Sequence, residues 1–159
     1  MDKSLTISKL CLICLLLAGP LTAFCQLSDN EAIKNVINRM CDAMRDGDTI
    51  TFKEFFADRV NIQYISPKND TTRNLVTVNA ADFLHRMAML KTESWDEKMI
   101  RFDDVNVSNG IAVVWGPYKF YIGKKLDHCG IATYQMMKTP WGWKIVSMFY
   151  SVKSGNCPD

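Results

Sequence analysis

Alternating apolar and polar positions dominate the second half of the chain. Three runs rich in Val, Ile, Tyr, Phe and Trp cover residues 111–122, 128–138 and 143–152. The breaks between them fall at Gly123 and at Pro140-Trp141-Gly142, which is punctuation typical of antiparallel hairpins. The sequence therefore predicts three consecutive antiparallel strands, and we expect the functional surface to lie on a face of this sheet.

A helical period governs the first half of the chain. Ser28 and Glu31 form a capping-box pattern, and Gly47 suits the position just after a helix end. Between them lies one apolar stripe at helical spacing, made by Ile33, Val36, Ile37, Met40, Cys41 and Met44. Shorter helices are predicted over 49–57 and 79–90, and further strands over 60–65, 74–78 and 99–107.

Turn chemistry predicts how the strands pair. Asn109-Gly110 supplies both positive φ angles of a type I′ turn, so Val107 should face Ala112. The same ladder, if uninterrupted, would bring Arg101 opposite Tyr118. Across the last turn the expected pairs are Met136 with Ile145, Tyr134 with Ser147, and Ala132 with Phe149. The turn at Gly123 leaves the neighbour of His128 open among Lys119, Phe120 and Tyr121.

The first 25 residues have the organisation of a secretory signal. Two lysines precede an apolar run over 10–18, which Gly19-Pro20 ends, and a short cleavage region leads to Gln26. We expect a signal peptide over 1–25, a domain over 26–152 and a loose tail over 153–159, with the protein secreted or periplasmic. The alternative is a lipoprotein acylated on Cys25, which Phe24 disfavours because a small residue is needed there.

The charge and the cysteine and histidine content limit the partners, cofactors and disulfides that we expect. The chain carries 19 Lys and Arg against 17 Asp and Glu, with no basic stripe, so we expect no nucleic-acid partner and no stable membrane association. Neither His85 nor His128 has a ligand partner at metal-site spacing, so we expect no metal and no other cofactor. Cys41, Cys129 and Cys157 follow the signal, so at most one disulfide forms. We expect Cys41 and Cys129 to be buried thiols.

The order of these elements resembles a known family. Helices followed by a curved sheet that closes on GWKIV (142–146) are similar to the NTF2-like, or SnoaL-like, α+β cone with a cystatin-like fold. The stretch over 115–148, with Trp115-Gly-Pro-Tyr118 and His128-Cys-Gly130, resembles more narrowly uncharacterised secreted bacterial members, sometimes called lumazine-binding-like. The resemblance implies N-terminal helices packed in a strongly curved antiparallel sheet, with an interior pocket. Members known for chemistry are isomerases, dehydratases and cyclases, whereas others only bind or dimerise.

Three functions remain open. The first is binding of a small apolar or aromatic ligand in a pocket lined by Tyr64, Trp95, Trp115, Tyr118, His128, Tyr134 and Phe149. The second is an enzyme of isomerase, dehydratase or cyclase type in which His128 is the catalytic acid–base. The third, compatible with both, is a homodimer formed through an outer sheet face with Thr133, Gln135, Met137, Met148 and Tyr150.

His128 is the candidate catalytic residue, and its neighbours in the sequence bear on whether it lies at a site. Gly130 and Ala132 follow it on the same predicted face, and small side chains beside an imidazole leave room for a guest. Against this, Gly130 could serve only to bend the strand. Because neighbouring strand residues point to opposite faces, we expect His128 to pair with neither Asp127 nor Cys129. His85 and Arg86 are assigned to a solvated helix face.

Overall fold

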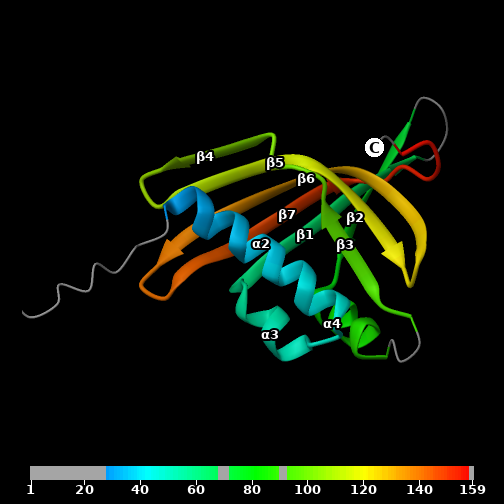
Figure 1. Cartoon of the computed structure of the whole chain (residues 1–159), viewed down its shortest axis with the longest axis horizontal. Coiled ribbons are helices and arrows are strands. Elements are labelled where there is room, and N and C mark those ends of the chain that lie inside the picture. Colours follow the sequence, from blue (N-terminus) through cyan, green and yellow to red (C-terminus); the bar gives the residue numbers. More distant parts are fainter. Residues whose placement is uncertain (1–27, 68–71, 90–92, 158–159) are drawn as a thin grey trace, which may run out of the picture.

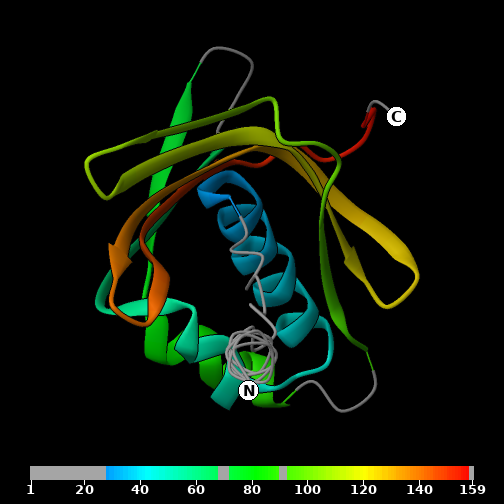
Figure 2. The same ribbon diagram turned by 60° about the vertical axis from the view of Figure 1, so that its left-hand side comes forward.

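A long, strongly bent sheet wraps around helix α2, Asp29–Arg45 (Figures 1 and 2). The computed structural model describes residues 28–67, 72–89 and 93–157. Two shorter helices, α3 (Thr49–Glu54) and α4 (Ala80–Met89), lie at the open end of the bend. The predicted signal peptide and its cleavage site lie outside the described residues.

Seven strands form one sheet in the described part of the chain, in the order β2-β1-β7-β6-β5-β3, with β4 also paired to β5. Their bounds are β1 Phe56–Pro67, β2 Arg73–Val78, β3 Trp95–Met99, β4 Asp104–Ser108, β5 Ile111–Ile122, β6 Lys125–Thr139 and β7 Gly142–Ser151. Neighbours are antiparallel except β1 and β7, which run parallel. The α+β fold class is confirmed, and the sheet is mixed rather than purely antiparallel.

The apolar stripe predicted on α2 lies in the hydrophobic core. Ile33, Ile37 and Met40 are fully buried. The Ser28 hydroxyl accepts a hydrogen bond from the Glu31 amide at 3.3 Å, and Gly47 follows the helix with φ of 68°. The capping and stop signals therefore work as the sequence indicates.

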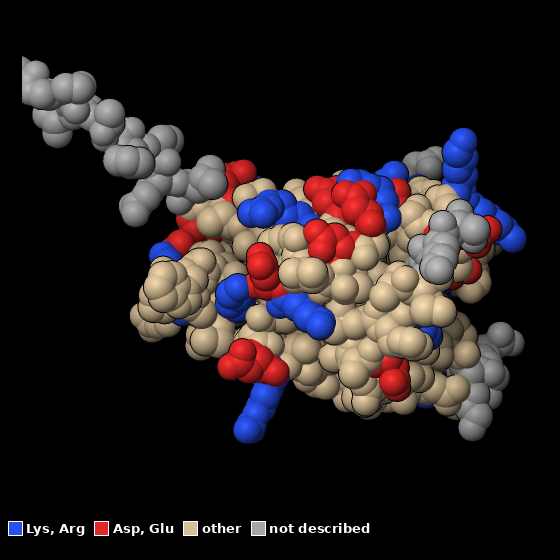
Figure 3. Space-filling model, turned by 90° about the horizontal axis from the view of Figure 1, so that it is seen from below, with Lys and Arg blue, Asp and Glu red and all other residues tan. Residues whose placement is uncertain are grey.

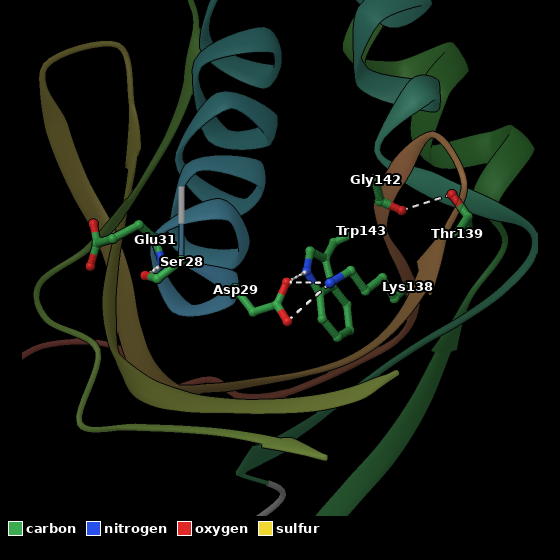
Figure 4. A network of polar contacts seen from close by, with 7 residues as sticks. All are labelled: Ser28, Asp29, Glu31, Lys138, Thr139, Gly142 and Trp143. Carbon is green, nitrogen blue, oxygen red and sulfur yellow. Dashed lines mark hydrogen bonds and ion pairs between the residues drawn. The ribbon is translucent and has the colours of Figure 1, made fainter. Parts of the chain in front are cut away.

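Asp29 ties the start of α2 to the hairpin between β6 and β7 (Figure 4). Its carboxylate accepts hydrogen bonds from Lys138 Nζ at 2.8 and 3.1 Å and from Trp143 Nε1 at 3.1 Å. The hydrogen bond from Lys138, and then that from Trp143, lowers the pKa of the Asp29 carboxyl. This contact joins residues more than a hundred positions apart and fixes one end of the helix inside the bend.

The ladder predicted from Asn109-Gly110 is confirmed at Val107 and Ala112, and Asn109 and Gly110 have φ of 49° and 75°. It does not run on to Arg101. Residues 100–103 leave the sheet, and Met99 lies opposite Tyr118 instead. The single strand predicted over 99–107 is therefore two strands, β3 and β4, separated by a break.

A bulge in β7 overturns part of the predicted register. Met136 faces Ile145 as expected, but Val146 is an extra residue, so Tyr134 lies opposite Met148 and Ala132 opposite Tyr150. One extra residue exchanges the two faces of a strand. Met148 and Tyr150 consequently turn to the concave side, so the prediction that placed them on the outer dimer face is wrong, and Phe149 turns outward.

Cys129 and Cys157 form a disulfide, so the expected free thiol at Cys129 is wrong. The backbone of Lys153 also pairs with that of Cys129, through hydrogen bonds of 2.8 and 3.0 Å. Residues 153–157 are thus tied to β6 rather than loose. Cys41 is a free thiol in the core, as predicted.

Lys and Arg side chains alternate with Asp and Glu side chains over the face shown in Figure 3. Neither sign gathers into a patch there, in keeping with the formal net charge of +2. Among the described residues, no helix combines the length and the apolar character that crossing a bilayer requires.

Candidate functional site

A cavity of about 260 Å³ opens between the concave side of the sheet and the three helices. Its walls come from α2, α3, α4 and six strands. The lining residues are Met40, Met44, Phe52, Ile62, Tyr64, Val78, Phe83, Arg86, Trp95, Glu97, Phe120, Ile122, His128, Met148, Tyr150 and Val152. Most of these side chains are apolar or aromatic, and a few polar groups converge among them, which is the composition of small-molecule sites.

Contacts between aromatic rings hold the walls in place. Phe83 packs on Trp95 with ring centroids 5.4 Å apart, and Trp95 contacts Phe120 at 6.1 Å. On the opposite side Tyr64 stacks on Tyr150 at 5.3 Å. Aromatic pairs at such separations contribute stabilisation beyond the area that they bury, so these contacts help to hold the cavity walls together.

His128 lies at the end of this ring series. It faces Phe120 across β5 and β6, which settles the register at Gly123, and the two rings stack at 4.8 Å. A bulge makes Asp127 the extra residue of β6. Asp127 Oδ2 lies 2.7 Å from His128 Nδ1, so the expectation that these two do not pair is wrong. The strand rule fails here because the bulge changes the direction in which Asp127 points.

Glu97 is the acidic group of the cavity. It sits on β3, and its Oε1 accepts a hydrogen bond from the Tyr134 hydroxyl at 2.8 Å. Burial raises the pKa of Glu97 to about 7, against a smaller lowering by the Tyr134 hydrogen bond. A carboxyl group that changes charge near neutral pH inside an apolar cavity is typical of functional sites.

Arg86 is the basic group of the cavity. It lies in the last turn of α4, with its guanidinium 5.8 Å from the centre of the Trp95 ring. The side chain is exposed yet lines the cavity, so it marks the place where the cavity meets solvent. The assignment of Arg86 to a purely solvated face is therefore wrong, whereas His85 lies outside this cavity.

Solved structures of other proteins share this architecture. A conserved protein from Planctomyces limnophilus superposes with a TM-score of 0.62 at 16% identity, over 80% of this chain and 98% of that one. An NTF2-like protein with a cystatin-like fold from Novosphingobium aromaticivorans gives 0.61 at 15% identity, over 98% and 93%. A putative dehydratase of the NTF2-like family from Streptomyces avermitilis gives 0.58 at 20% identity, over 79% and 96%. The chain has the NTF2-like fold.

Comparisons of sequence give a different result from comparisons of structure for this NTF2-like chain. No protein-family model matches it, and a search of curated proteins finds no match. The likeness therefore extends to the fold alone, and the narrower resemblance to lumazine-binding-like proteins stays a prediction.

Of the seven predicted pocket residues, the NTF2-like cone brings Tyr64, Trp95 and His128 to the cavity. Tyr118 and Tyr134 point inward but are packed into the core, 2% and 0% exposed. The Tyr118 hydroxyl donates to the Ser151 carbonyl at 2.9 Å, and burial raises the pKa of both phenols. These two tyrosines therefore belong to the hydrophobic core and do not line the cavity.

Trp115 and Phe149 lie on the convex face of the sheet, 48% and 40% exposed, so neither lines the cavity. Alternation along β5 turns Trp115 away from the buried Val114 and Gly116. Phe149 is displaced by the bulge at Val146, and Tyr150 and Met148 take the place predicted for it.

Gly130 does not leave room for a guest. A Cβ atom there would lie 1.9 Å from the Ser151 carbonyl oxygen, so this glycine allows β6 and β7 to approach each other. This close approach to Ser151 is neither of the two explanations considered for Gly130, which were room for a guest and a bend in the strand.

Sequence reasoning missed Glu97, although a signal was present. Trp95, Glu97 and Met99 alternate with Asp96 and Lys98, which places the glutamate on an apolar face. The strand predicted over 99–107 begins after Glu97, so this alternation was not counted.

Proposed function

We propose that this protein is exported and binds a small, largely apolar or aromatic molecule in the cavity of the NTF2-like cone. The observation that carries the proposal is the cavity itself, walled by stacked rings and methionines and reached by only a few polar groups. Apolar surface that stays accessible inside a fold favours an apolar guest, since burying it removes it from water.

The volume limits the size of the guest. At about 30 Å³ for each water molecule, 260 Å³ holds roughly nine waters, the size of a one-ring or small two-ring organic molecule. Methionines at Met40, Met44 and Met148 give part of the wall some freedom to adapt.

The disulfide supports the export part of the proposal. Disulfides form and persist in oxidising compartments and are rare in the cytosol. The Cys129–Cys157 bridge joins the last strands to the tail, and Cys41 is buried away from exchange. The cleavage predicted before Gln26 is tested by N-terminal sequencing of the exported protein, and a diacylated Cys25 would overturn it.

Calorimetric titration with 2-naphthol tests the binding. Val152 lines the cavity, so Val152→Trp should fill it and abolish binding. Val113→Trp makes the same change on the convex face, where Val113 is 42% exposed, and should leave binding intact. No binding to the wild type, or equal binding to both variants, would refute the proposal.

A second candidate function is acid–base catalysis by His128. The observation favouring it is the Asp127–His128 contact at 2.7 Å, since a carboxylate on one ring nitrogen orients the other nitrogen for proton transfer. Asp127→Asn should then lower turnover of any substrate far more than it lowers binding. A variant with unchanged turnover would remove Asp127 from the reaction.

Self-association through the convex sheet face is also proposed, because that face is apolar. Its exposed large side chains are Ile111, Val113, Trp115, Met137 and Phe149. A contiguous patch of this kind is typical of an interface. Light scattering should give the mass of a dimer for the wild type and of a monomer for Trp115→Lys, and a monomeric wild type would refute this part.

A further inference from the structure

Arg86 places an uncompensated positive charge at the mouth of the cavity. No acidic side chain of the described residues forms an ion pair with it. Its guanidinium is instead held against the face of Trp95, which is itself a wall residue. A planar guanidinium with free donors binds carboxylates through two parallel hydrogen bonds.

Glu97 offers a different group inside the same cavity. Its Oε1 is occupied by the Tyr134 hydroxyl, while Oε2 has no hydrogen-bond partner among the described residues. Among the described residues, every fully buried side-chain nitrogen or oxygen atom has a hydrogen-bond partner. Because Oε2 has none, it is not fully buried, and since Glu97 lines the cavity, we take Oε2 to be accessible from there. A partly neutral carboxyl in an apolar wall favours an uncharged hydrogen-bonding group such as a hydroxyl, and it disfavours an anion.

Trp95 links the two groups along one wall, because Arg86 lies against its ring and Glu97 follows it two residues later in β3 and lines the same cavity. Tyr150 and its stacked partner Tyr64 add aromatic surface to the same cavity. The cavity therefore offers an anion site at its mouth, an apolar middle and a neutral polar site within.

We propose that the ligand is a small aromatic carboxylic acid whose carboxylate lies on Arg86 and whose hydroxyl group, at the opposite end of the ring system, reaches Glu97. This inference rests on the proposed binding function and names the ligand class for the same cavity. Charge at one end and a neutral donor at the other also give the ligand a single orientation.

The test compares acids with their methyl esters, which have nearly the same shape and no charge. The probes are 4-hydroxybenzoate, 4-hydroxycinnamate and 6-hydroxy-2-naphthoate, their methyl esters and their analogues without the hydroxyl, titrated by calorimetry at pH 7. The wild type should bind the best-fitting acid about tenfold more tightly than its ester, as a charge-assisted pair provides. Loss of the hydroxyl should weaken binding severalfold.

Two variants test whether Arg86 causes the preference for the acid over its ester. Arg86→Gln should remove the preference for acid over ester while binding of the ester stays the same. Arg59→Gln removes an exposed charge from β1 outside the cavity, and it should keep the wild-type preference.

The outcomes separate this inference from the proposed function. Binding of acid and ester with equal affinity, or an acid preference that survives Arg86→Gln, would overturn the carboxylate assignment and leave the binding function standing. Equal affinity with and without the hydroxyl would overturn the assignment of Glu97. Absence of binding by every acid and ester would overturn the inference, and the proposed function falls only where 2-naphthol also fails to bind.

Discussion

Glu97 should make the stability of this protein fall as pH rises through the neutral range. In the folded state burial raises the pKa of Glu97 from 4.5 to about 7. Between these values the folded chain holds a proton that the unfolded chain has released, so the free energy of unfolding decreases with increasing pH. The penalty is absent below about pH 4.5 and complete above pH 7. Replacing the carboxyl by an amide, Glu97→Gln, removes the charge and keeps an acceptor for Tyr134.

The size of the effect follows from the two pKa values. A move from 4.5 to about 7 corresponds to about 3 kcal/mol of unfolding free energy. Part of the carboxyl faces the cavity, where solvent reduces the penalty, so we expect roughly 1–3 kcal/mol. Glu97→Gln should therefore equal the wild type in stability near pH 4.5 and exceed it by this amount at pH 8.

Urea denaturation followed by circular dichroism, from pH 4.5 to pH 8.5, measures the difference. Glu54→Gln is the matched control, because Glu54 is exposed at the end of α3 and outside the cavity. Its difference from the wild type should not change with pH. A Glu97→Gln difference that is also independent of pH would refute the argument that burial holds this carboxyl in its neutral form.

Three further substitutions and one thiol titration test other parts of the structure. Cys157→Ser opens a bridge with a sequence separation of 28 residues and should lower the unfolding free energy by about 3.5 kcal/mol on chain-entropy grounds, and an unchanged melting temperature would contradict this. Thiol titration of a chain that begins at Gln26, denatured without reductant, should find Cys41 alone, and a second thiol would contradict the disulfide. His128→Ala should leave the melting temperature nearly unchanged while weakening 2-naphthol binding, so a destabilised variant of unchanged affinity would end the site role of His128. Tyr134→Phe removes the hydrogen bond to Glu97, so it should raise the pKa of Glu97 further and lower the free energy of unfolding by roughly 1–3 kcal/mol at pH 8 but by less at pH 5. An equal loss at both pH values would show that Tyr134 does not stabilise the charged form of Glu97.

Local signals in the sequence were sufficient for most of the fold. The Ser28 cap, Gly47 and Asn109-Gly110 each determine a backbone geometry through their own side chain or its absence, so they act without knowledge of the partner segment. The helical stripe of α2 and the alternation of β5 likewise report burial directly.

Some of the errors trace to bulges and to contacts between distant segments, which no local pattern encodes, whereas Trp115 is turned outward by the plain alternation of β5. Bulges at Asp127 and Val146 each add one residue to a strand, and each one changes which side chains face inward. Alternation counted from a turn is right up to the bulge and reversed beyond it, which is why Phe149 was placed inside and Tyr150 outside. Arg86 reaches the cavity only because α4 packs beside Trp95, a contact between segments that the sequence leaves unpaired.

Methyl NMR of the methionine side chains tests most directly whether the cone cavity binds a small molecule. Met40, Met44 and Met148 line the cavity, whereas Met137 lies on the convex face, 42% exposed, and serves as an internal control. Titration of the protein, labelled with ¹³C at the methionine methyls, with 2-naphthol should shift the three cavity signals together and leave the Met137 signal in place. Shifts at Met137 with the cavity signals unmoved, or no shifts at all, would contradict the account.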